Sequence, residues 1–152
     1  MGNEAVEIGL WHANNVAEEF ELSQIVLIGD MPPNDPDEVL VKRSQRGEEY
    51  WRGHARYSEP TNYHEQLESL AEKQIPVHCF FVDDHRAEAA FRHIAQSTGD
   101  ESNPNLISAC EFLDINSPQG ADVLTKAVTT SFLNYVGGPA LAATYDDTFR
   151  CT

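Results

Sequence analysis

Residues 24–29 read QIVLIG, and this stretch decides the fold class. It is short, rich in β-branched residues and apolar on both faces, which is typical of a parallel strand covered by helices on each side. Pro32 and Pro33 cannot continue the strand, because proline removes a hydrogen-bond donor from the ladder, so the chain must turn after Asp30. We therefore predict a central parallel strand at 24–29.

Two more strands are predicted, at 76–82 and 109–114. Amphipathic periodicity and capping signals predict helices over 3–20, 36–46, 62–73, 85–98 and 117–137. Asp83 and Asp84 are expected to cap the fourth helix, and Gly137-Gly138-Pro139 to end the last. Residues 48–59 have no clean period and are predicted to form an irregular aromatic loop.

Alternation of helices and strands favours right-handed crossovers and a parallel sheet. The predicted fold class is α/β, a three-layer Rossmann-like arrangement of about three parallel strands with helices on both faces. With three strands, the most apolar strand falls at an edge unless the strand order places it centrally, and an exposed apolar edge is an aggregation hazard. We expect either an unusual order or a further strand that pairs there.

The length and net charge of the chain exclude some classes of partner. A chain of 152 residues fits one domain, and 10 Lys and Arg against 25 Asp and Glu give a net charge of −15, which repels phosphate backbones. Nucleic acid is therefore not an expected partner, and neither is a membrane, because no apolar stretch approaches the roughly 20 residues that span a bilayer. Three cysteines without C-x-x-C spacing and the lack of a secretory signal predict an intracellular, cytoplasmic protein.

Five stretches, in this order, resemble the second half of a von Willebrand factor type A (VWA) domain: 4–10, 27–34, 75–82, 94–99 and 113–117. The resemblance gives a partial VWA-like domain over 1–138 and a C-terminal tail over 139–152. The chain is most similar to intracellular members, including those that accompany alpha-type kinase domains. The resemblance implies a six-stranded doubly wound sheet, and we expect its N-terminal strands to be absent from this chain.

VWA domains commonly hold a divalent cation at the carboxyl ends of their strands. The ligands come from an Asp-x-Ser-x-Ser motif, a threonine and an aspartate at the end of the fourth strand, and only that aspartate has a counterpart here, Asp30. The resemblance therefore implies an incomplete metal-ion-dependent adhesion site. Because Mg²⁺ requires a near-octahedral set of oxygens, we expect Mg²⁺ binding at Asp30 to be weak or absent.

Asp30 also has two other interpretations. It is a turn carboxylate that caps backbone amides, or it serves a phospho-acceptor switch or metal-dependent enzyme together with Asp35 and Asp37. Helix capping accounts for Asp35 and Asp37 as well. His78 is expected to share a strand face with Phe80 and Val82, which favours a core histidine over a ligand.

The predicted partner surface lies in the aromatic loop. Tyr50, Trp51, Arg52 and Tyr57 have the composition of an interface hot spot, although such side chains also serve to cover neighbouring helices. The overall prediction is a protein-interaction module that is not an enzyme. Its expected partner is a protein, such as a strand-donating or self-associating chain.

Overall fold

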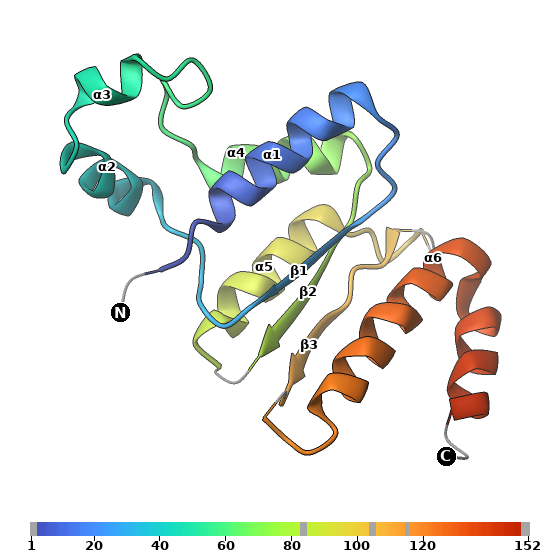
Figure 1. The fold of residues 1–152 in the computed structure, drawn as a ribbon. Helices are drawn as coiled ribbons and strands as arrows, with labels where there is room; N and C mark the ends of the chain where they lie inside the picture. Colours follow the sequence, from blue (N-terminus) through green and yellow to red (C-terminus); the bar gives the residue numbers. More distant parts are fainter. Residues whose placement is uncertain (1–2, 83–84, 104–105, 115, 150–152) are drawn as a thin grey trace.

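The computed structural model describes residues 3–82, 85–103, 106–114 and 116–149. Three parallel strands form one sheet in the order β1-β2-β3 (Figure 1): β1 (Ile25–Gly29), β2 (Val77–Val82) and β3 (Cys110–Leu113). The helices are α1 (Val6–Glu19), α2 (Pro36–Ser44), α3 (Glu48–Arg52), α4 (Tyr63–Glu72), the 3₁₀ turn η1 (His85–Ala87), α5 (Glu88–Thr98) and α6 (Gly120–Phe149). The predicted α/β, three-layer Rossmann-like fold class is confirmed.

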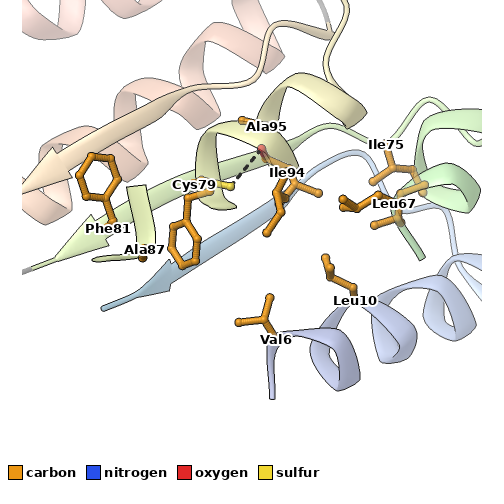
Figure 2. Packing of buried hydrophobic residues seen from close by; sticks show 12 residues of the cluster. Val6, Leu10, Leu67, Ile75, Cys79, Phe81, Ala87, Ile94 and Ala95 are labelled. Carbon is orange, nitrogen blue, oxygen red and sulfur yellow. Dashed lines mark hydrogen bonds between the residues drawn. The ribbon is translucent and has the colours of Figure 1, made fainter. Parts of the chain in front are cut away.

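Strand β2 carries the core, because all of its residues are buried. Successive side chains of a strand point to opposite faces. Val77, Cys79 and Phe81 pack on one face against α1, α4 and α5, and Figure 2 shows this cluster with the Cys79 thiol directed at the Ala95 carbonyl. On the other face, Phe80 packs in a second cluster with residues of β3 and α6. The two helical layers are thus anchored on one strand.

Strand β1 is not central, which corrects the prediction made from its apolar sequence. In the described part of the chain its only strand partner is β2, with Ile25 opposite Val77 and Gly29 opposite Phe81. Ile28 is 45% exposed. Apolarity on both faces is shared by β1 and β2, so it could not reveal which strand has neighbours on both sides.

The predicted helix starts of α2 and α4 are confirmed. Asp35 and Glu38 form a reciprocal capping box, and Pro36 occupies the first turn, where its missing N–H costs nothing. The Asn62 side chain accepts a hydrogen bond from the His64 N–H at the start of α4. Both helices therefore begin where local side-chain chemistry places them. The predicted caps Asp83 and Asp84 and the tail residue Cys151 lie outside the described residues.

Two segments differ from the expectation. Residues 48–52 form the short helix α3 instead of irregular loop. The helical backbone is interrupted at Gly138, whose φ of 73° is favourable only for glycine, which confirms the predicted break at the glycine pair. A second helical half of α6 then runs through residues that were assigned to the tail. Its second half folds back on the first (Figure 1), where Asp146 Oδ1 lies 3.3 Å from Lys126 Nζ and Ala142 is buried.

Candidate functional site

Asp30 follows the last residue of β1, at the edge of the sheet where the carboxyl ends of the strands meet, and it is partly buried. Asp114 occupies the corresponding place after β3 and caps the N–H of Asn116 at 3.1 Å. Strand β2 separates these two positions. Residues 3–82, 85–103, 106–114 and 116–149 contain no cluster of three or more His, Cys, Asp or Glu side chains suited to a metal ion. One carboxylate does not match the oxygen set that Mg²⁺ requires.

Of the two neighbouring carboxylates, Asp35 caps helix α2. Asp35 Oδ1 accepts from the Glu38 N–H at 2.8 Å, and Glu38 Oε2 accepts from the Asp35 N–H at 3.0 Å. Asp37 is exposed in the first turn of α2. The capping interpretation of Asp35 is therefore confirmed.

Two of the predicted partner residues, Trp51 and Tyr57, contact a buried arginine that sequence reasoning missed. Arg43 is 6% exposed, and its guanidinium donates to the carbonyls of Tyr57 (2.9 Å), Ser58 (2.8 Å) and Glu59 (3.3 Å). Glu48 Oε2 lies 3.3 Å from Nη2. One side chain of α2 thus contacts both ends of the segment 48–59. No local pattern marks Arg43, because its acceptors lie up to sixteen residues away.

The aromatic side chains of this segment divide into covered and outward-facing ones. Trp51 donates from Nε1 to the Arg43 carbonyl at 2.9 Å and lies under its guanidinium, 4.9 Å from the ring centre. Tyr57 packs on Trp11 with ring centres 5.5 Å apart. Tyr50 is 47% exposed, and Arg52 is exposed as well. Tyr50 and Arg52 therefore present a surface to solvent, while Trp51 and Tyr57 mainly support it.

The free edge of β1 is a second candidate surface. The Ile25 N–H donates to the Pro76 carbonyl at 2.9 Å. Because backbone groups alternate sides along a strand, those of Val26 and Ile28 point away from β2, toward the open edge. The α6 layer packs mainly on β2 and β3, which leaves the Ile28 side chain half exposed. This edge combines apolar side chains with backbone groups that have no partner within the described ranges.

Comparison with protein families, characterised proteins and solved structures finds no match to this chain. No helix in the described ranges is long and apolar enough to cross a membrane.

His78 is a core histidine, as predicted, and its hydrogen bonds fix its proton. Nδ1 accepts from the Ala109 N–H at 3.1 Å, so the proton of the neutral ring is on Nε2, which faces Gln24 Oε1 at 3.1 Å. Burial lowers the pKa of His78 below its ordinary value of 6.5. A second proton would have to sit on Nδ1, against the Ala109 N–H.

We expect His78 to make stability depend on pH. Because the unfolded chain binds this proton more readily than the folded chain, the free energy of unfolding falls as the pH drops below about 6.5 and levels off below the folded pKa. Urea denaturation at several pH values measures the effect. In His78→Asn, whose amide oxygen is positioned to accept from Ala109, this part of the pH dependence should vanish; an unchanged profile would contradict the assignment.

Proposed function

We propose that this chain is a protein-interaction module whose open β1 edge accepts a strand from outside the described residues. The observation that carries the proposal is the position of β1, the most aliphatic strand, at a sheet edge, where it has one neighbouring strand among the described residues. Unpaired N–H and C=O groups at such an edge are a template for another strand, a common mode of peptide recognition.

The features that natural edge strands use against association are sparse here. Lysine, proline and bulges commonly blunt an edge, but residues 25–29 read IVLIG. Ile28 contributes both an outward-facing N–H and a 45% exposed side chain. An added strand would accept a hydrogen bond from the Ile28 N–H and would also cover part of the exposed Ile28 side chain.

The proposal includes the VWA resemblance, which is consistent with an added strand. The resemblance implies that the strand at 24–29 lies within a wider sheet and that further strands adjoin it. An added strand would place β1 between two neighbours, as its sequence predicts. We propose the outward-facing Tyr50 and Arg52 as additional partner contacts, with Trp51 and Tyr57 as their support.

Self-association tests the open edge directly, because every copy of the chain carries it. Two copies related by a two-fold axis would pair their β1 strands antiparallel into one continuous sheet. We expect sedimentation to show association of the unmodified chain at micromolar concentrations. Ile28→Pro should remove it, since proline deletes an outward donor and leaves the bonds to β2 intact.

Ile28→Lys provides a second test, because charge at an edge opposes strand pairing. Val41→Lys is the matched control, since Val41 is 62% exposed on α2, away from the edge. Circular dichroism should be the same for all variants. A chain that stays monomeric at every concentration, or an Ile28→Pro variant that associates like the unmodified chain, would count against the open-edge proposal.

A further inference from the structure

Two histidine side chains from different helices lie next to each other on the surface of α4 and α5. His64 is on the first turn of α4, His93 is near the middle of α5, and both are exposed. Their ring centres are 5.5 Å apart, and the ring planes are inclined at 59°. The strand-addition proposal uses neither of these histidines.

The core of the domain fixes the separation of the two histidines. Leu67 on α4 and Ile94 on α5 are buried in the same apolar cluster, and the Tyr63 ring packs against that cluster. The Tyr63 ring centre lies 3.9 Å from that of His64 and 6.4 Å from that of His93. The three rings therefore form one group that is carried by two packed helices and not by loops.

The distance between the two rings suits a shared metal ion. With a metal–nitrogen distance of about 2.1 Å and the nitrogen about 1.1 Å from the ring centre, two imidazoles on one tetrahedral ion have ring centres about 5.2 Å apart. The observed separation of 5.5 Å needs no movement of either helix. Both rings are exposed, and χ2 of histidine is broad, so each ring can turn a nitrogen toward a common point.

The contacts of the two rings leave nitrogens free for a metal. His93 Nδ1 lies 3.4 Å from Ser97 Oγ. A metal-bound histidine commonly donates its other ring N–H to an oxygen, so this contact favours Nε2 of His93 as the ligand atom. The ring nitrogens of His64 have no hydrogen-bond partner among the residues that the structure describes. The adjacent cation, Arg92, is paired with Glu88 at 2.8 Å, and a net charge of −15 attracts metal cations to the chain.

We propose that His64 and His93 together bind one divalent transition-metal ion of the class that prefers imidazole, such as Zn²⁺ or Ni²⁺. Mg²⁺ and Ca²⁺ prefer oxygen ligands and do not suit this pair. Closed structural zinc sites use four protein ligands, so two histidines leave the remaining positions of the ion to water. The bound ion joins α4 to α5 and thereby stabilises the folded chain. The site is separate from Asp30 and independent of strand addition at β1.

Titration calorimetry of the full chain with Zn²⁺ and with Ni²⁺ tests the site. We expect each ion to bind and to raise the melting temperature, whereas Mg²⁺ and Ca²⁺ should not compete. His64→Gln and His93→Gln should each weaken binding at least about tenfold, because each removes one of two protein ligands. His12→Gln is the matched control, since His12 is exposed on α1 and belongs to no histidine pair among the described residues. It should bind both ions like the unmodified chain.

NMR of ¹⁵N-labelled histidine side chains locates the ion. Zn²⁺ should shift the ring nitrogens of His64 and His93 and leave those of His12 unchanged, and in His93 the larger shift should be at Nε2. Ile28→Pro should bind Zn²⁺ like the unmodified chain, which separates this result from the edge test. If neither ion binds, or if His64→Gln and His93→Gln bind as tightly as the unmodified chain, the proposal is wrong. Binding that survives both substitutions would belong to other groups, such as the cysteine thiols.

Discussion

Phe91→Ala should lower the free energy of unfolding by about 3–5 kcal/mol, the usual cost of deleting a buried phenylalanine ring. Phe91 is fully buried and belongs to the cluster that joins α5 to β2. It also lies against β1, where a Cβ added at Gly29 would sit 3.3 Å from its Cζ. Removal of the ring therefore opens a cavity between a helix and two strands. Urea denaturation should show a lower midpoint with an unchanged slope.

The matched control is Phe20→Ala, because Phe20 is 67% exposed just beyond α1. Its stability should change by no more than about 0.5 kcal/mol. A loss below about 1 kcal/mol for Phe91→Ala would mean that the core collapses around the deletion, contrary to the packing described for this cluster.

Arg43→Met should release the segment 48–59. The variant removes hydrogen bonds from a cation to three backbone carbonyls, each worth about 1.5–3 kcal/mol, and leaves Trp51 without its cation. Arg52 and Arg56 lie within the segment, so trypsin reports on its opening. We expect cleavage after these residues to accelerate about 10- to 100-fold, while the core strands remain protected.

Arg43→Lys is the second variant, which keeps the positive charge. One ammonium cannot reach all the acceptors to which the planar guanidinium donates. This variant should resemble Arg43→Met. Arg46→Met, which alters an exposed arginine over Tyr50, should leave the cleavage rate at Arg52 unchanged. Equal rates in the Arg43 variants and the unmodified chain would show that the segment is held by other contacts.

Much of the fold follows from local patterns. The caps of α2 and α4 and the apolar runs of β1 and β2 are written in consecutive residues, so they could be predicted. The break at Gly138 could be predicted from the glycine pair, but the helical half of α6 that follows it could not, because that half depends on packing against the first half, including the pair Lys126–Asp146.

The residues of the candidate sites could be predicted from the sequence less well than the fold could. The composition of the segment marks Tyr50, Trp51, Arg52 and Tyr57 as candidates. It does not mark Arg43, although Arg43 contacts Trp51 and both ends of the segment. His64 and His93 lie far apart in the sequence, each on its own helix. Their approach depends on the packing of α4 against α5.

The sequence by itself determined the α/β class, the parallel strands and most helix boundaries, because these rest on periodicity and capping within a few residues of each other. Only the tertiary structure decided that β2 is central, that β1 is left at an open edge, and that His64 and His93 lie side by side. The physical reason is that strand order and convergent polar groups depend on contacts between residues distant in the chain. The apolarity and charge of a short stretch do not indicate which distant residues will contact it in the folded chain.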